Sequence, residues 1–224
     1  MTKGRKQRGR RALSGEARAR FRVKIATTAQ ALFFAAGYDA VSMRKVAAAL
    51  NVSPMTLYLY FKNKRAILIH IWSAIFTEAF AACQAAAQVA ATPQAKLFAY
   101  CHAYVGYWLR HPQHYALIYL NQDLPQAGEA FFITDAGIVR ELAFLRALLR
   151  RAGVAEDKAE PVLQQIIIAL NGVCHAALTI PEYPWDPPLA QAEHMVRALL
   201  QAASYEAENP APRSAEQGPR RKES

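Results

Sequence analysis

The sequence contains few of the residues from which disulfide frameworks, metal sites and disordered chains are built. Only three of its 224 residues are cysteines, Cys83, Cys101 and Cys174, and their spacing fits neither a disulfide framework nor a zinc site. Charged residues make up 20% of the chain and apolar residues 53%, which excludes a chain that is disordered throughout. We expect no metal site and no cofactor.

The sequence also lacks a convincing membrane segment. No apolar stretch typical of a secretory signal follows the basic N-terminus. The longest run without charge covers residues 161–181, but it contains Gln164, Gln165, Asn171 and His175 and has prolines at both ends. Four polar side chains are unfavourable in a lipid-spanning helix, so a buried helix of a bundle is the better interpretation. We expect a cytoplasmic protein with no membrane partner.

Acidic residues are nearly absent from the first quarter of the chain. Residues 1–65 hold 15 Lys and Arg against two acids, whereas residues 66–205 hold eight against eleven and residues 206–224 hold four of each. A local excess of positive charge indicates a polyanionic partner, although a solvated arm that promotes solubility would have the same composition. A membrane-surface anchor is a weaker alternative, because residues 1–17 offer only Leu13 and scattered alanines as apolar surface.

Helical spacing fills the chain between two segments that lack it. Residues 1–13 predict a disordered basic arm, and residues 206–224, rich in Pro, Ser, Glu and Arg, predict a disordered tail. Between them no alternating strand pattern occurs, which predicts an all-α chain of about nine helices. In the first helix, we expect a buried stripe of Phe21, Ile25, Leu32 and Ala36. The predicted helices cover residues 14–36, 42–50, 53–61, 64–90, 94–109, 113–121, 130–152, 160–180 and 188–205.

Residues 42–61 have the pattern of two helices joined by a four-residue turn. Ser42 and Ser53 suit the N-cap position of each helix, and Pro54 suits the first position of the second. Asn51 suits the left-handed conformation in which a helix often ends. Leu57 and Phe61 are four residues apart and should face the core. This is a helix-turn-helix, whose second helix enters the major groove of DNA.

The exposed side of the second helix carries groups that recognise DNA. Hydroxyls and lysines suit phosphate oxygens, and the apolar surface of Met55, Thr56 and Leu59 suits thymine methyl groups. Arg44 on the preceding helix suits guanine. Tyr58 and Tyr60 could instead pack the small domain, but Leu57 and Phe61 already supply its core. We therefore favour DNA contact for both tyrosines.

Several segments, in this order, resemble the DNA-binding domain of the tetracycline-repressor family. They are residues 33–38 (FFAAGY), 41–47 (VSMRKVA), 50–53 (LNVS) and 57–64 (LYLYFKNK), followed by Leu68. The similarity spans residues 19–68, and Asn51 stands where the family often has glycine. On the pattern and the resemblance together, the predicted DNA-binding residues are Ser42, Arg44, Ser53, Pro54, Met55, Thr56, Tyr58, Leu59, Tyr60 and Lys64.

The resemblance implies a ligand-responsive transcriptional regulator. Its simplest form is a repressor that binds a palindromic operator in double-stranded DNA as a homodimer and is released by a small, mostly apolar or aromatic effector. An activator of the same fold is the alternative. The implied domains are a DNA-binding domain over residues 14–65 and a ligand-binding and dimerisation domain over residues 66–205. The predicted dimer contacts are Val162, Ile166, Ala169, Val173, Met195 and Leu199.

A row of aromatic residues in the second domain is the candidate effector site. Four of them share one helical face and two lie on the next helix. Such a stripe is either plain core or the wall of an amphipathic cavity, because buried hydroxyl groups need partners. The predicted effector-binding residues are Tyr100, Tyr104, Tyr107, Trp108, Tyr115, Tyr119, Asn171 and His175.

An enzyme that uses the Cys174 and His175 region is a weak alternative. Adjacent residues on a helix point about 100° apart, so this pair makes no contact between a nucleophile and a base. We expect no catalytic residues and no enzymatic activity.

Overall fold

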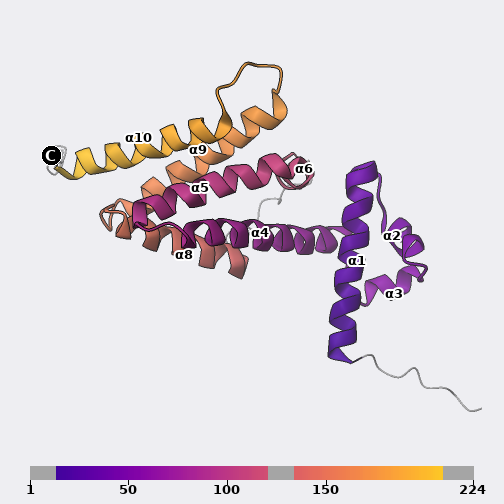
Figure 1. Cartoon of the computed structure of the whole chain (residues 1–224). Helices are drawn as coiled ribbons and strands as arrows, with labels where there is room; N and C mark the ends of the chain where they lie inside the picture. Colours follow the sequence, from indigo (N-terminus) through magenta and orange to yellow (C-terminus); the bar gives the residue numbers. More distant parts are fainter. Residues whose placement is uncertain (1–13, 121–133, 209–224) are drawn as a thin grey trace, which may run out of the picture. The chain divides into compact units, whose positions relative to one another are not determined.

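The computed structural model describes residues 14–120 and 134–208, and helices joined by turns and loops are the only regular secondary structure over these residues (Figure 1). This confirms the predicted all-α fold with about nine helices. The predicted arm and residues 209–224 lie outside the described residues, and so do the end of the predicted helix 113–121 and the start of the predicted helix 130–152. The last helix continues to Glu208, into the predicted tail. The helices are α1 (Gly15–Ala36), α2 (Met43–Ala49), α3 (Pro54–Tyr58), α4 (Lys64–Gln88), α5 (Pro93–Arg110), α6 (Pro112–Tyr119), α8 (Ala136–Arg151), α9 (Ala159–Thr179) and α10 (Pro188–Glu208).

The first three helices begin at serine N-caps, and α1 and α2 end near residues that tolerate a positive φ. The hydroxyls of Ser14, Ser42 and Ser53 each accept a hydrogen bond from the backbone N–H three residues later, which is the N-cap interaction. After α2, Asn51 adopts a φ of 54°, in the left-handed region where asparagine is tolerated better than most residues. Gly37 ends α1 with a φ of 80°.

The chain divides into two compact units. The first contains the residues through Glu78 together with residues 113–137, and the second contains residues 79–112 and those from Ile138 onward. The division falls within α4, whereas the sequence predicts a domain boundary after residue 65. The first unit extends beyond the predicted domain of residues 14–65 because the start of α4 and all but the first residue of α6 belong to it. The indole N–H of Trp72 on α4 donates to the carbonyl of Leu117 on α6 at 3.0 Å.

The core of the first unit differs in one respect from the predicted stripe. Ile25 is fully buried as expected, but the stripe continues through Ala29 to Phe33, at intervals of four residues. Leu32 is half-buried and Ala36 is exposed, so the prediction was wrong for that end of the helix. Ala29 and Phe33 occupy the part of the core that we expected Leu32 and Ala36 to fill.

In the second unit, α5, α9 and α10 pack against one another. By length and composition alone, α4 and α9 could each cross a membrane, but the core helix of a bundle meets the same criterion. Like a helix of a bundle, α9 buries a set of side chains within the chain, namely Ala159, Val162, Leu163, Ile166, Leu170, Val173 and Cys174.

Candidate functional site

The second helix of the helix-turn-helix, α3, packs against the rest of the domain on one side and is exposed to solvent on the other. Leu57 is fully buried and Phe61 is 2% exposed, as the sequence predicts, and α2 packs against α3. On the opposite side, Met55, Tyr58 and Leu59 expose 71, 50 and 62% of their surfaces. Such exposure is unusual for three large apolar or aromatic residues on one short helix, and it leaves them free for a partner.

The ten predicted DNA-binding residues are all partly or fully exposed. Thr56, Tyr60 and Lys64 are half-buried. The remaining seven are exposed, namely Ser42, Arg44, Ser53, Pro54, Met55, Tyr58 and Leu59.

Some of these polar groups already have partners within the chain. The Ser53 hydroxyl accepts from the backbone N–H of Thr56 at 3.2 Å and lies 2.9 Å from its hydroxyl. The Lys64 ammonium donates to the carbonyl of Tyr38 at 2.9 Å and lies 3.8 Å from the centre of its ring. Because an ammonium has three N–H groups, Lys64 can still donate to a phosphate.

Two arginines of α1 hold the end of the recognition helix, and sequence analysis missed both. Arg18 donates to the carbonyl of Leu59 at 2.9 Å, and Arg22 donates to the carbonyl of Tyr60 at 2.6 Å. The last carbonyls of a helix lack intrahelical partners and carry partial negative charge, which guanidinium groups neutralise. Arg22 also lies 4.0 Å from the centre of the Phe61 ring. The only feature of the sequence that could have indicated these bonds is the spacing of the two arginines, which lie one helical turn apart on α1.

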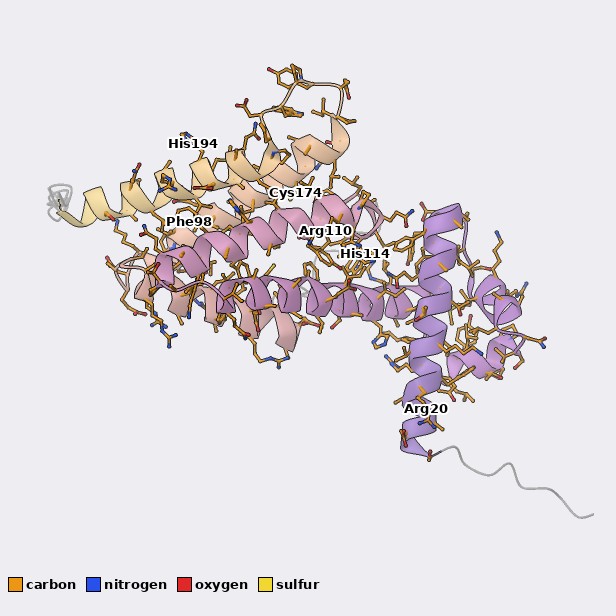
Figure 2. All side chains as sticks on the ribbon, viewed as in Figure 1. Arg20, Phe98, Arg110, His114, Cys174 and His194 are labelled. Carbon is orange, nitrogen blue, oxygen red and sulfur yellow. The ribbon has the colours of Figure 1, made fainter. Side chains whose placement is uncertain are left out.

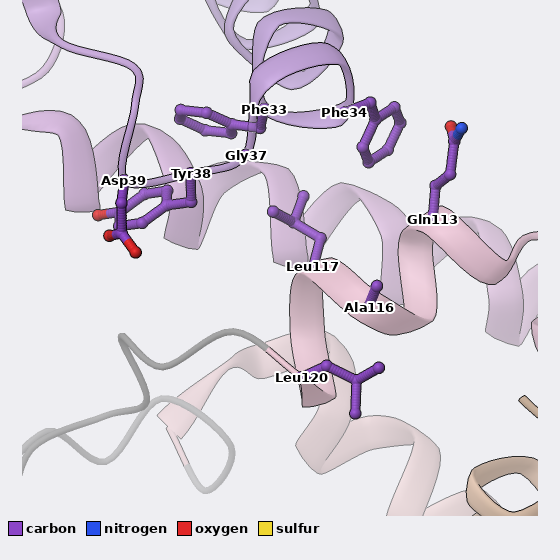
Figure 3. A pocket seen from close by; sticks show the side chains of 9 residues that line it. All are labelled: Phe33, Phe34, Gly37, Tyr38, Asp39, Gln113, Ala116, Leu117 and Leu120. Carbon is purple, nitrogen blue, oxygen red and sulfur yellow. The ribbon is translucent and has the colours of Figure 1, made fainter. Parts of the chain in front are cut away.

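The first unit also contains a groove beside the end of α1 (Figure 3). Its volume is about 340 Å³. Most of the residues that line it are apolar, and Asp39 and Gln113 supply the charged and amide side chains. It is lined by Phe33, Phe34, Gly37, Tyr38, Asp39, Gln113, Ala116, Leu117 and Leu120.

The aromatic residues predicted to bind an effector divide between the two units. In the second unit, Tyr100, Tyr104, Tyr107 and Trp108 are all buried, and the Tyr104 hydroxyl donates to the side-chain oxygen of Asn171 at 2.8 Å. This bond joins two of the predicted residues across α5 and α9. His175, on α9, is exposed. In the first unit, the rings of Tyr115 and Tyr119 lie 4.8 Å apart.

The cysteines have the environment of core residues. Cys174, labelled in Figure 2, is fully buried, and burial raises the pKa of its thiol to about 12. Burial likewise raises the pKa of Cys101 to about 12. Thiols with such pKa values are protonated at neutral pH and are poor nucleophiles. No group of three or more potential metal ligands occurs among the residues that the structure describes.

Some of the predicted dimer contacts are buried within the chain, and others are partly or fully exposed. Val162, Ile166 and Val173 are buried within their own chain, Ala169 and Leu199 are half-buried, and Met195 is 42% exposed. The apolar surface that α9 offers to solvent is centred on Ile168, which is 71% exposed. A groove of about 580 Å³ runs beside it, lined among others by Gly172, Ala176, Trp185 and Met195.

Comparisons with known proteins agree with this architecture. Residues 25–71 match the family model described as bacterial regulatory proteins of the tetR family, and residues 97–201 match the tetracyclin repressor-like C-terminal domain. Among curated proteins, none matches the chain at a significant level.

Solved structures of similar fold match 80–85% of this chain. The TetR-family regulator PfmR of Thermus thermophilus is 26% identical, with a TM-score of 0.56, and the match covers 80% of this chain and 97% of PfmR. The regulatory protein SCO4313 is 20% identical, with a TM-score of 0.67 and coverage of 85 and 100%. The fatty acid degradation regulator FadR of Bacillus halodurans is 18% identical, with a TM-score of 0.60 and coverage of 80 and 94%.

A capped helix-turn-helix at the end of a long helix, followed by a helical domain, defines a DNA-binding transcriptional regulator. With both of its characteristic domains matched, the chain belongs to the tetracycline-repressor family.

Proposed function

We propose that this protein is a transcriptional repressor that binds a palindromic operator as a homodimer in the cytoplasm and is released by a small, mostly apolar or aromatic effector. The observation that carries the DNA-binding part is the exposed surface of α3, with Met55, Tyr58 and Leu59 turned to solvent. It lies within a segment that holds 15 basic and two acidic residues. A positive segment attracts phosphates, and side chains on the exposed helix read bases.

Selection of bound sequences from a random duplex pool tests the proposal. We expect a palindromic sequence, because a two-fold dimer presents two equal recognition helices. Arg44→Ala and Thr56→Ala should change the selected sequence, since both residues belong to the surface that reads bases. Lys64→Ala should reduce the slope of log affinity against log salt by about 0.9, the value for one phosphate contact. A pool without enrichment would contradict the proposal.

The basic N-terminal residues should add affinity without sequence preference. They lie outside the described residues, but their composition alone favours phosphate contacts or the adjacent minor groove. Deletion of residues 1–12 should therefore weaken binding to all duplexes by a similar factor. A loss confined to the operator would show that the arm reads sequence.

The effector part of the proposal rests on the aromatic face of α5. Buried rings with a hydroxyl-to-amide bond between Tyr104 and Asn171 provide an apolar surface with one adjustable polar pair. One structural neighbour is described as a regulator of fatty acid degradation, which is compatible with an apolar effector. Tyr104→Phe keeps the ring and removes the hydroxyl, so it should alter the response to effector while operator affinity stays unchanged. Gel shifts with and without compounds that raise the melting temperature measure both.

Transcription from the selected site distinguishes a repressor from an activator of the same fold. A reporter that is silent with the protein and active without it supports repression. A reporter that needs the protein for transcription supports the activator.

A further inference from the structure

A groove in the second unit has two positively charged residues and no acid in its wall. It lies between α4, α5 and α8, and its volume is about 190 Å³. Lys96 of α5 and Arg151 of α8 both line it, and neither forms an ion pair with another residue that the structure describes. The other wall residues are Gln84, Ala87, Gln88, Phe144, Ala147 and Leu148. Two positive charges therefore face one small volume, and nothing in its wall neutralises them.

The other arginines near the end of α8 show that acids are within reach of this helix. Arg146 pairs with Glu160 at 2.9 Å, and Arg150 pairs with Glu156 at 2.8 Å. Arg151 follows directly after Arg150 but lines the groove instead. A cation in the last turn of a helix is favourable in itself, because the C-terminal end carries partial negative charge. That effect does not account for a second unpaired cation in the same wall.

Lys96 is in a position where the helix itself disfavours a cation. Since α5 begins at Pro93, Lys96 is its fourth residue, and no acid occupies the first turn. The N-terminal end of a helix carries partial positive charge, which makes a lysine there electrostatically unfavourable. Lys96 is also half-buried, so water screens its charge incompletely. An anion in the groove would neutralise both Lys96 and the helix end.

The remainder of the wall provides apolar surface. Ala87 and Leu148 belong to the core, with 2 and 5% of their surfaces exposed, whereas Phe144 is 37% exposed. A large exposed apolar side chain beside buried ones favours the binding of an apolar group. The groove therefore complements a molecule that has one anionic end and a compact apolar body.

One acid contacts the wall from the core without lining the groove. Glu141 of α8 is 4% exposed, and its carboxyl group accepts a hydrogen bond from the side-chain amide of Gln84, a wall residue. The Tyr100 side chain hydrogen-bonds the same carboxyl group. Burial raises the pKa of Glu141, which favours its neutral form. Glu141 therefore reduces the positive potential of the groove less than an exposed acid would.

We propose that this groove binds a small organic carboxylate with a compact apolar body. Its carboxylate accepts hydrogen bonds from Lys96 and Arg151, and its apolar body packs against Phe144 and Leu148. Hydrogen bonds between charged groups are stronger than those to a neutral amide, so the site prefers the anion. The groove has roughly the liquid volume of six water molecules, which suits a molecule of the size of hexanoate or benzoate. The site shares no residue with the aromatic effector site proposed above, and only an effect of the carboxylate on DNA binding would rest on the proposed function.

Titration calorimetry on the full chain without DNA tests the site with compounds that differ in one group. The probes are hexanoate and benzoate, the amides hexanamide and benzamide, the amines hexylamine and benzylamine, and acetate, which has the charge without the apolar body. We expect hexanoate or benzoate to bind about tenfold or more tightly than its own amide, its own amine and acetate. An amide that binds as tightly as its carboxylate would overturn the proposal, and so would the absence of binding by both carboxylates.

Variants assign the contacts. Arg151→Gln and Lys96→Gln should each reduce the affinity for the carboxylate to nearly that of its amide and leave the affinity for the amide unchanged. Phe144→Ala should weaken the binding of both compounds. The matched control is Arg140→Gln, because Arg140 is exposed on the same helix, forms no ion pair with a described residue and does not line the groove. Arg150→Gln is the second control. Controls that lose as much affinity as Arg151→Gln would show that the net charge of α8 attracts the anion, which would refute the site.

Melting curves separate binding from stability. If Arg151→Gln lowers the melting temperature but binds the carboxylate as the parent protein does, Arg151 only stabilises the end of α8, and the proposal is wrong. Operator affinity is measured separately and without these compounds. Failure to bind an operator would contradict the proposed function and leave the carboxylate site intact, whereas failure to bind either carboxylate would remove the site and leave DNA binding intact.

Discussion

At the scale of single residues, the most informative side chains are those that connect parts of the chain that sequence patterns treat separately. Arg22 is such a residue, because it joins α1 to the end of the recognition helix through the carbonyl of Tyr60. No periodicity identifies this bond, since the partner is a backbone atom 38 residues away.

We predict that Arg22→Met destabilises the fold by about 1.5–3 kcal/mol, the usual contribution of a hydrogen bond from a charged group. Met keeps an apolar chain against the Phe61 ring but offers no donor. Urea denaturation measures the change. Arg20→Met is the control, because Arg20 is exposed on α1 (Figure 2) and its partner is the equally exposed Glu16. The control should change stability by less than about 0.5 kcal/mol. An equal loss in both variants would show that the Tyr60 bond contributes nothing.

Glu141 gives a prediction about pH. Burial raises its pKa above the ordinary value of 4.5, so the folded chain binds a proton more tightly than the unfolded chain does. The contribution of Glu141 to stability is therefore fully present below pH 4.5 and is lost as the pH rises through the raised pKa. Gln has no such dependence.

We accordingly expect Glu141→Gln to melt at a higher temperature than the parent protein at pH 7 and at nearly the same temperature at pH 4.5. Melting curves across this range, with Glu160→Gln as the exposed control, measure the difference. A difference that grows toward acid would mean that Glu141 is stabilised as a carboxylate.

At the scale of helices, the N-cap and the packing of α3 stabilise it, because the helix is too short to be stable by itself. A helix of five residues is too short to be stable alone, so its cap and its packing hold it. Ser53→Ala removes the cap and should cost about 1 kcal/mol. Urea denaturation checks this value, and Ser53→Asp, which retains an acceptor, should restore most of the loss. If Ser53→Ala were neutral, packing of Leu57 would account for the helix by itself.

The helices show which features of this chain a sequence can predict. Caps and breaks are local, so Ser42, Ser53 and Asn51 were predicted at their observed positions. Tertiary pairs are not local, so the arginine bonds to α3 and the burial of Glu141 were missed. Helical periodicity also does not distinguish a side chain that packs in its own chain from one that packs in a partner. Val162 and Ile166 illustrate this: we predicted them at the dimer interface from their spacing, and the structure buries both within the single chain.

At the scale of the whole molecule, the proposed function links the binding of DNA and of effector through one equilibrium. An effector that weakens operator binding tenfold must itself bind about tenfold more weakly to the protein–operator complex. Calorimetric titration of the effector into free protein and into the complex should give this ratio. Equal affinities would mean that the compound binds without regulating.

The last prediction concerns assembly. Ile168, Gly172 and Ala176 follow one another at intervals of four on α9, and Gly172 and Ala176 share a groove with Met195 of α10. This face is apolar and contains small residues, so a second copy can approach closely about a two-fold axis. Ile168→Glu would place two unpaired carboxylates in such an interface, one from each copy, and burial of unpaired charge is strongly unfavourable.

We therefore expect Ile168→Glu to sediment as a monomer and to lose operator affinity, because a monomer presents one recognition helix to a site built from two halves. Since Ile168 is 71% exposed, the substitution should leave the melting temperature of the monomer unchanged. Val89→Glu is the matched control: Val89 is 88% exposed but lies just beyond the end of α4, away from α9 and α10 along the chain. Dimers of Ile168→Glu at micromolar concentration would place the interface elsewhere.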